Sequence, residues 1–309
     1  MVAMVAVLGE SERVHINVLD EAHERYARGL LQGRSPRSRI AFHRVPTDDA
    51  WCRDYGALFV VDGHGKSMAL DFGFNAWGGK YRPWNRDAAV GASMAAILGV
   101  RRFVPGMVLE GGSVDVNGAG ALLTTEQCLL DRNRNPGLDR VQVEARLKHS
   151  LGVKQVIWLE GGIEGDDTDG HVDAVARFVS ADRVVAAVEP DERDANHRPL
   201  LANRARLEGA RLSAGQRLEV VDIPMPDPLH WRGRRLPASY LNFYAANDLV
   251  LVPRFGRPQD EVAMDILGGC LPGRRIVPID CRHIVIGLGA VHCLTQQVPA
   301  VRYTAATGA

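Results

Sequence analysis

Apolar residues recur along the chain with two different periods, one typical of helices and one typical of strands. From residue 18 to residue 31 they return at every fourth position, at Ala22, Tyr26 and Leu30, and the pattern ends at Gly33. This spacing predicts an amphipathic helix closed by a glycine. Three more segments combine a similar pattern with an Asp near the start and a Gly just after the end, so we expect helices at 87–98, 139–151 and 260–267.

Short runs of β-branched and aliphatic residues lie between these helices and predict strands, because Gly, Asp or Pro bounds each run. The runs are 57–61, 68–72, 120–125, 156–159, 184–188, 249–253, 275–279 and 284–288. Two glycine-rich segments, 61–66 and 116–120, predict tight turns between paired strands. The fold class is therefore α/β, but strands outnumber helices, and a doubly wound parallel sheet with one helix per strand fits this order poorly.

No Pro/Ser-rich linker, low-complexity run or block of like charges divides the sequence. We therefore expect a single domain over residues 1–309, a length that can bury a sizeable core. The densest charged stretch, 189–199, is interpreted as a solvated loop.

Composition excludes several classes of partner. Lys and Arg number 37 and Asp and Glu also number 37, so no net field favours nucleic acid or an anionic membrane. No run approaches the ~20 apolar residues of a membrane helix, and the first fifteen residues lack the basic region and cleavage site of a signal peptide. The five cysteines are odd in number and form no CxxC pair, which argues against a disulfide framework and predicts a cytoplasmic protein.

Chemistry-bearing residues first gather in GDDTDGHVDAVARFV (165–179). His171 and Asp173 alternate there with apolar residues, so a strand would place both side chains on one face, close enough to act on one ligand. A calcium loop does not fit, because its first and twelfth positions would fall on Gly165 and Ala176. No second His/Cys cluster at ligand spacing supports a metal site. A capping carboxylate beside a surface histidine is the structural alternative.

A second group lies in PTDDAWCRDYG (46–56), where Asp48, Asp49 and Asp54 surround Trp51 and Arg53. A carboxylate beside an indole can hold a planar cation, since the acid accepts its N–H groups and the ring covers its face. The alternative is a turn held by hydrogen bonds from its own Asp side chains.

The stretch GLGAVHCLTQQVP (287–299) places Cys293 among glycines and amides instead of in an aliphatic run. A nucleophilic cysteine needs thiolate character. His292 is adjacent, but on a strand it would face the opposite way, so His171 is the candidate base. Glu110, next to two glycines in LEGGS (109–113), could orient an imidazole or belong to a turn. A small buried core residue remains the alternative for the cysteine.

These segments together resemble the family of agmatine deiminases and bacterial-type peptidyl-arginine deiminases, which belong to the guanidine-modifying enzymes. The matching pieces occur in the family's order from about residue 48 to residue 302, and include DDAWCRD, DFGFNAWGGKY, LEGGS, LLTTEQCLL, NRNP, DDTDGHVD, LPASYLNFY, VPRFG and VHCLTQQVPA. The resemblance implies an α/β propeller, a pseudo-fivefold ring of ββαβ units whose loops meet at a central acidic pocket.

The resemblance also implies a reaction and the residues that carry it. We expect hydrolysis of agmatine to N-carbamoylputrescine and ammonia, a step of polyamine synthesis, through a thiouronium intermediate and without metal or organic cofactor. The implied roles are Cys293 as nucleophile, His171 as general acid/base, Asp54 and Asp173 as guanidinium ligands, Glu110 as the partner of His171, and Trp51, Asp48 and Asp167 in the substrate site. Asp166 and Glu164 are further candidates for the acid that binds agmatine's ammonium group.

Two departures from the family pattern bear on substrate and completeness. Leu288 and Ala290 stand where agmatine deiminases carry Gly and Asn, and relatives begin with about one more strand–helix unit. We therefore expect an incomplete N-terminal unit, which would leave the ring open, with a homodimer as one way to cover the exposed edges. The alternatives are a deiminase of peptidyl-arginine or another guanidino compound, and a non-catalytic guanidine-binding homologue or fragment.

Overall fold

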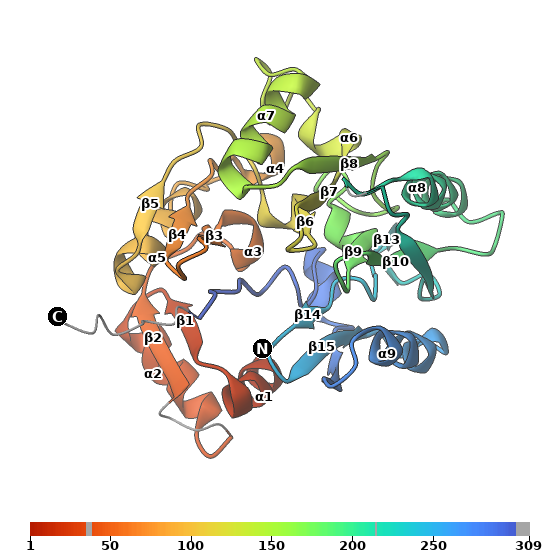
Figure 1. Cartoon of the computed structure of the whole chain (residues 1–309). Coiled ribbons are helices and arrows are strands. Elements are labelled where there is room, and N and C mark those ends of the chain that lie inside the picture. Colours follow the sequence, from red (N-terminus) through yellow and green to blue (C-terminus); the bar gives the residue numbers. More distant parts are fainter. Residues whose placement is uncertain (35–38, 214, 301–309) are drawn as a thin grey trace.

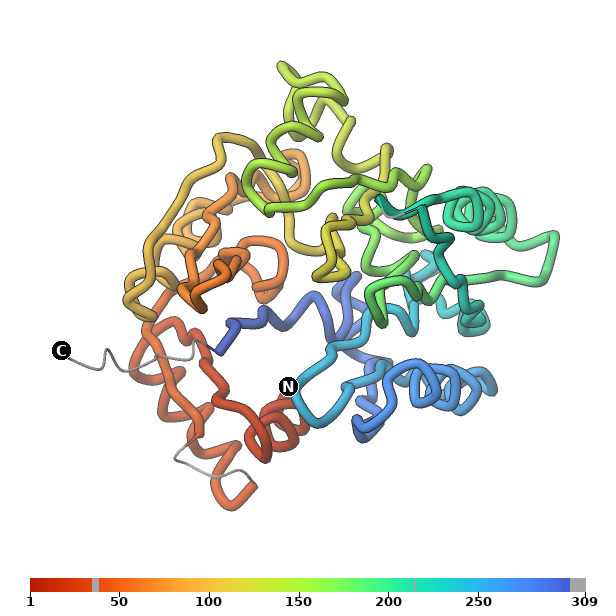
Figure 2. Tube along the Cα trace, in the orientation of Figure 1, coloured from red at the N-terminus to blue at the C-terminus, as the bar shows by residue number. Residues whose placement is uncertain are grey.

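A ring of five α/β units surrounds a common centre, with the helices on the outside and the loops at the inner ends of the strands (Figure 1). The computed structural model describes residues 1–34, 39–213 and 215–300. Successive units take successive places around the ring, as the colour change along the trace shows (Figure 2). This is the predicted pseudo-fivefold α/β propeller.

Four of the units contain a three-stranded sheet in which the first pair of strands is antiparallel and the second pair is parallel. Their strands are β3 Leu58–Val61, β4 Ser67–Leu70 and β5 Arg101–Phe103; β6 Asp115–Val116, β7 Ala121–Thr125 and β8 Gln155–Leu159; β9 Ala176–Phe178, β10 Arg183–Val188 and β11 Glu219–Pro224; β14 Tyr244–Ala245, β15 Leu249–Arg254 and β16 Arg275–Asp280. One long helix links the parallel strands of each unit: α5 Val90–Leu98, α7 Arg140–Leu151, α8 His197–Gly209 and α9 Gln259–Cys270.

The N-terminal unit is smaller. It contains α1 Val2–Ser11, β1 Val14–Val18, α2 Glu21–Leu31 and β2 Ile40–Arg44. The two strands are parallel, and within the described ranges no third strand pairs with β1. The ring is nevertheless closed, contrary to our expectation, because Glu12 Oε1 accepts from Asn247 N (2.7 Å) and Glu10 pairs with Arg275 (2.5 Å) in the last unit.

The remaining elements are short and connect the units. They are α3 Cys52–Tyr55, α4 Ala76–Gly79, α6 Glu126–Leu129 and the hairpin β12 His230–Trp231 with β13 Arg234–Arg235. The segments 61–66 and 116–120 link antiparallel strands, as predicted.

Capping residues explain why the ends of α7 and α5 could be predicted from the sequence. The Asp139 side chain accepts a hydrogen bond from Gln142 N, and the Gln142 side chain accepts one from Asp139 N, so α7 begins with a complete capping box and ends at Gly152 in the left-handed conformation. Gly99 closes α5 in the same way.

Several predictions of local structure were wrong. α9 continues through Gly268 instead of ending there, and α8 begins at His197 within the segment interpreted as a solvated loop. The run 284–288 forms a 3₁₀ turn at Ile284–Gly287, not a strand. His171 precedes a second 3₁₀ turn, Val172–Ala174, and β9 starts only at Ala176. Both turns lie at the ring centre, where the chain bends between units instead of pairing.

Candidate active site

The five residues to which catalytic roles were assigned lie together at the ring centre, although they come from different units. Asp54 lies on α3, Glu110 precedes β6, His171 and Asp173 flank a turn before β9, and Cys293 lies in the turn after the last unit. Asp54 Oδ1 is 3.7 Å from His171 Nδ1, Glu110 Oε2 is 4.0 Å from His171 Nε2, and Cys293 Sγ is 3.9 Å from Asp173 Oδ2.

A glycine permits this close approach. A Cβ atom on Gly112 would lie 2.5 Å from His171 Nδ1 and 2.9 Å from Asp54 Oδ1, and neither distance is tolerable. The bare backbone instead donates from Gly112 N to Asp54 Oδ1 (3.1 Å). The LEGGS segment therefore contributes both Glu110 and the space that the other side chains need.

A cavity of ≈ 240 Å³ opens next to this cluster. Asp54 and Cys293 reach it directly, whereas His171, Asp173 and Glu110 are not part of its wall. The lining residues are Asp49, Trp51, Asp54, Trp77, Tyr81, Asp167, Thr168, Ile286, Gly287, Leu288, Gly289 and Cys293. One part of the wall is acidic and another is apolar, so the cavity suits a small cation with an apolar portion.

The acids predicted for the substrate site divide into two groups. Asp167 lines the cavity, and Tyr81 Oη donates to its Oδ2. Asp48 does not line it, because its Oδ2 instead accepts from Arg86 N (3.0 Å). Its neighbour Asp49 takes that place in the wall.

The two further candidate acids also lie outside the wall. Asp166 is occupied within its own loop, where it accepts from Thr168 N, Thr168 Oγ1 and Gly170 N. Glu164 is likewise absent from the lining.

Burial governs the ionisation of the site. It raises the pKa of Asp54 well above the usual range, and repulsion from Asp173 and Glu110 adds to this. Burial raises the pKa of Asp173 to about 7, although Arg177 and Arg53 oppose the shift. The pKa of Cys293 is raised well above its ordinary value by burial and then by Asp173 and Asp54. A cation bound beside these groups would lower all three pKa values.

The imidazole of His171 is neutral in the same environment. Burial lowers its pKa well below the ordinary value, and the charge of Arg134 lowers it further. Neither ring nitrogen has a hydrogen-bond partner among the described residues. A neutral, unpartnered imidazole can accept a proton from a reacting group before it donates one.

Arg134 supplies the counter-ion of Glu110. Its Nε donates to Glu110 Oε1 (2.6 Å), and the side chains of both residues are fully buried. The same guanidinium contacts the loop before His171, through Asp169 Oδ2 (2.6 Å) and the Thr168 carbonyl (2.7 Å). Burial raises the pKa of Glu110, while the charge of Arg134 and its hydrogen bond oppose the rise.

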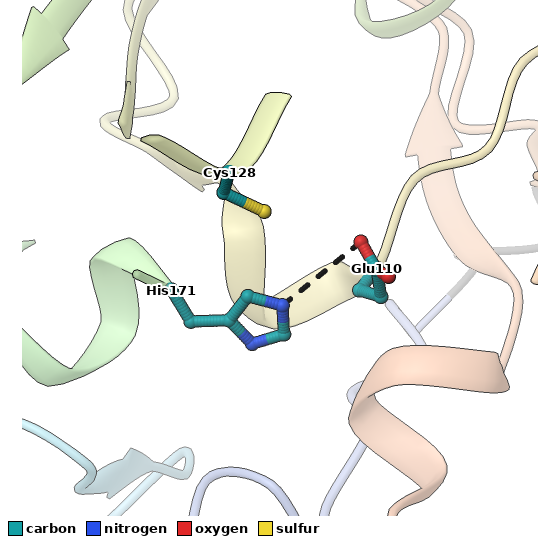
Figure 3. Close-up of side chains that lie close together, drawn as sticks. All are labelled: Glu110, Cys128 and His171. Carbon is teal, nitrogen blue, oxygen red and sulfur yellow. Dashed lines mark ion pairs between the residues drawn. The ribbon is translucent and has the colours of Figure 1, made fainter. Parts of the chain in front are cut away.

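Figure 3 shows that the Cys128 sulfur points toward Glu110 and His171. One ligand atom from each of the three lies within 4.8 Å of the others, and Zn²⁺ accepts this donor set. Arg134 places a fixed cation 2.6 Å from the same carboxylate, which opposes binding of a second cation there. The donor types fit a metal, but the local charge does not.

Asn242 is a contact of Cys293 that the sequence interpretation missed. Its Nδ2 donates to Cys293 Sγ (3.2 Å) and to Asp173 Oδ2 (3.2 Å), while its Oδ1 accepts from His292 N (3.0 Å). His292 does not face away from the site as a strand would require. The chain turns here, and His292 Nδ1 hydrogen-bonds with Asp173 Oδ2 (2.6 Å).

Arg53 anchors the turn that carries the cysteine. Its backbone N donates to the Cys293 carbonyl (3.1 Å), and its guanidinium donates to the His292 carbonyl (3.3 Å) and to Gln297 Oε1 (2.7 Å). Arg53 and Asn242 both lie in pieces that match the family, DDAWCRD and LPASYLNFY, and that match is the one sequence signal that could have identified them.

Comparison with known proteins agrees with this geometry. Residues 1–299 match the family model described as Porphyromonas-type peptidyl-arginine deiminase. An agmatine deiminase of Stutzerimonas stutzeri is 40% identical over 90% of this chain and 81% of its own length. The solved agmatine deiminase of C. jejuni with substrate bound, in a cysteine-to-serine form, is 33% identical, covers 94% of this chain and 84% of that chain, and has a TM-score of 0.85. The agmatine deiminase of Enterococcus faecalis is 31% identical over 96% and 86% of the two chains, with a TM-score of 0.90.

Replacement of Arg134 by Gln should lower the free energy of unfolding by about 3–5 kcal/mol, since it leaves a buried acid without its partner. The double variant Glu110→Gln with Arg134→Gln should recover part of this loss, because both charges are then removed. Urea denaturation followed by circular dichroism measures both effects.

Arg140→Gln is the matched control for this experiment, because its pair with Glu126 is 47% and 30% exposed. Its effect should stay under about 1 kcal/mol. Equal losses at Arg134 and Arg140 would contradict a dominant role for the buried pair.

Proposed function

Because the chain belongs to the Porphyromonas-type peptidyl-arginine deiminase family, we propose that it hydrolyses agmatine to N-carbamoylputrescine and ammonia through a covalent intermediate on Cys293. The observation that carries this proposal is the position of the Cys293 thiol in a small cavity, beside Asp54 and within 3.9 Å of Asp173. A guanidinium is the cation that such a cage of acids binds best, since its planar N–H groups match carboxylates.

Binding of the substrate activates the nucleophile. A guanidinium between Asp54 and Asp173 restores the favourable charge that burial removes, so both acids ionise and the pKa of Cys293 falls. Asn242 can then donate to the thiolate as well as to Asp173. The Cys293 proton passes to His171, which becomes an imidazolium near Glu110.

Deimination then proceeds in two stages on the same sulfur. The thiolate forms a bond to the guanidinium carbon, the imidazolium protonates one terminal nitrogen, and that C–N bond breaks to release ammonia. The remaining thiouronium is cationic. Neutral His171 removes a proton from water and the hydroxide adds to the carbon. The C–S bond then breaks as the added hydroxyl loses its proton to become the ureido C=O, and the imidazolium returns its proton to the thiolate, which regenerates neutral His171 and the Cys293 thiol. The hydroxyl proton is the one that ammonia carries away. The overall reaction consumes one water, and ammonia leaves the enzyme as ammonium.

The acids in the cavity wall favour a substrate with a second cation. Asp49 and Asp167 line the cavity in addition to Asp54, and no substrate carboxylate would be stabilised beside them. Agmatine carries an ammonium group at the end away from its guanidinium. A volume of ≈ 240 Å³ is also below the ~300–1,000 Å³ of sites for larger ligands, which favours a free small guanidine over a peptide. A deiminase of peptidyl-arginine is the second candidate, on the strength of the family description.

The cellular location and the partners of the protein form a separate part of the proposal. Within the described parts of the chain, no helix has the length and apolar character needed to cross a membrane. We propose a cytoplasmic location from the cysteine pattern, no nucleic-acid partner from the charge balance, and a homodimer by analogy with the family alone.

Turnover should distinguish the two candidate substrates. We expect ureido product from agmatine, and at least about tenfold lower kcat/KM with a capped arginine peptide, because the peptide must place backbone where the cavity closes. Colorimetric detection of the ureido group measures both. Cys293→Ala should abolish turnover, and Cys270→Ala, a buried cysteine elsewhere, should retain it. Preference for the peptide would reverse our ranking.

The pH profile should report the buried acids. A carboxylate binds the cation only when ionised, so kcat/KM should fall as pH drops through the pKa of Asp173, about 7. The loss should be at least about tenfold per pH unit below that value, because Asp54 must be ionised as well as Asp173. Steady-state kinetics from pH 5 to 9 tests this, and a profile flat to pH 5 contradicts it.

Substitution can distinguish the roles of the two acids predicted for the substrate site, Asp48 and Asp167. Asp167→Asn should raise the KM for agmatine about tenfold or more by removing a charge from the cavity wall. Asp48→Asn, the matched change outside the cavity, should leave KM within about twofold. Equal effects of the two substitutions would argue against a specific ammonium site at Asp167.

A further inference from the structure

A short strap, defined as Gly287, Leu288 and Gly289, forms the apolar side of the cavity next to Cys293. Leu288 adopts φ +70° and ψ +16°, the left-handed conformation that glycine accepts freely and other residues rarely do. Among the described residues, four others that are not glycine have positive φ: Ala76, Trp77, Asp169 and Arg232. A leucine in this conformation is strained, and such strain persists where function or packing requires it.

The two flanking glycines allow the backbone of the strap to lie against the indole of Trp51. A Cβ on Gly289 would lie 2.5 Å from a carbon of that ring, and one on Gly287 would lie 3.0 Å from another. The backbone can therefore follow the ring only where side chains are missing. Leu288 is the one residue of the strap that has a side chain, and it lines the cavity together with Ile286.

Another part of the wall carries charge. Asp49, Asp54 and Asp167 line the same cavity. The cavity thus combines an acidic portion for cationic ends with an apolar portion formed by Trp51, Ile286 and Leu288. This division matches a chain of methylene groups between two cations.

We propose that Leu288 is a specificity-determining residue, which contacts the methylene chain of the substrate and narrows the cavity against guanidines that carry substituents on that chain. This proposal rests on the proposed deiminase function. A leucine in place of a glycine fills volume beside the reacting thiol, so acyl and carboxamide groups on the α-carbon of an arginine derivative find no space. The strain at Leu288 is retained because the side chain selects substrate.

A purely structural role is the competing explanation, since Leu288 also packs against the large hydrophobic core. The two roles differ in what they change. Loss of packing lowers the free energy of unfolding and affects all substrates alike, whereas loss of selection changes the ratio between substrates.

The kinetic test compares wild type with Leu288→Gly and Leu288→Met on two substrates, agmatine and Nα-acetylarginine amide. Leu288→Gly should shift the ratio of kcat/KM at least about tenfold toward the acetylated amide, the effect of removing hydrophobic contacts from a binding pocket. Leu288→Met should keep the ratio close to that of wild type, because it preserves the side-chain volume. An unchanged ratio in Leu288→Gly overturns the proposal.

Arg232→Gly provides a matched backbone control. Arg232 is exposed, lies between β12 and β13, and has φ +49°. Its replacement relieves a similar strain outside the cavity and should leave the substrate ratio unchanged. A shift as large as that of Leu288→Gly would mean that relief of strain, not cavity width, alters selectivity.

A second measurement is independent of turnover, so it stands even if the wild type hydrolyses neither guanidine and the proposed function fails. The rates at which iodoacetamide and the bulkier N-phenylmaleimide alkylate Cys293 are followed by peptide mass spectrometry. Leu288→Gly should raise the rate with N-phenylmaleimide at least about fivefold relative to iodoacetamide, because the wider reagent gains access. Equal changes for both reagents would show that Leu288 does not limit the width of the cavity.

Discussion

The burial of three carboxyl groups and a thiol within a few ångströms of one another is the constraint on which this site depends. Charged groups at this spacing repel one another and lose hydration, so their pKa values rise together. Among the described residues, Glu110 is the one of these acids that pairs with a buried Arg or Lys, Arg134. In the same part of the chain Asp54 and Asp173 have hydrogen-bond donors but no such direct cation, and this leaves them dependent on a cation that arrives with the substrate.

The ring fold makes this arrangement possible, because each unit delivers one inner loop to the centre while the sheets and the outer helices form the hydrophobic core. The polar cluster therefore draws on residues more than a hundred positions apart. Gly112 shows the packing limit at the centre: one added carbon atom would collide with both His171 and Asp54. Contacts of Glu10 and Glu12 with the last unit close the ring even though the first sheet has two strands.

Elements set by local chemistry could be predicted from the sequence, and elements set by distant contacts could not. The helix 140–151 follows from its capping box, and strands such as 121–125 follow from their apolar runs. The run 284–288 has an equally strand-like composition, but residues 284–287 form a 3₁₀ turn, and Gly287 lies against the Trp51 ring. A contact with so distant a part of the chain is not visible in the local pattern. Whether Asp48 or Asp49 faces the cavity depends on hydrogen bonds with residues 86 and 87, nearly forty positions away. The resemblance of short motifs identified the chemistry that periodicity alone left open.

The position of His171 between two carboxylates allows it to stabilise the transition state of the proposed reaction more than the resting state. Its nitrogens lie 3.7 Å and 4.0 Å from carboxylate oxygens, beyond hydrogen-bond distance. Packing, not polar contact, therefore holds the neutral ring. When the ring takes the thiol proton, both nitrogens carry hydrogens and both carboxylates attract it, so the contacts strengthen only as charge develops. An interaction that grows along the reaction lowers the barrier without stabilising the resting state, and a pre-formed ion pair at His171 would lack that advantage.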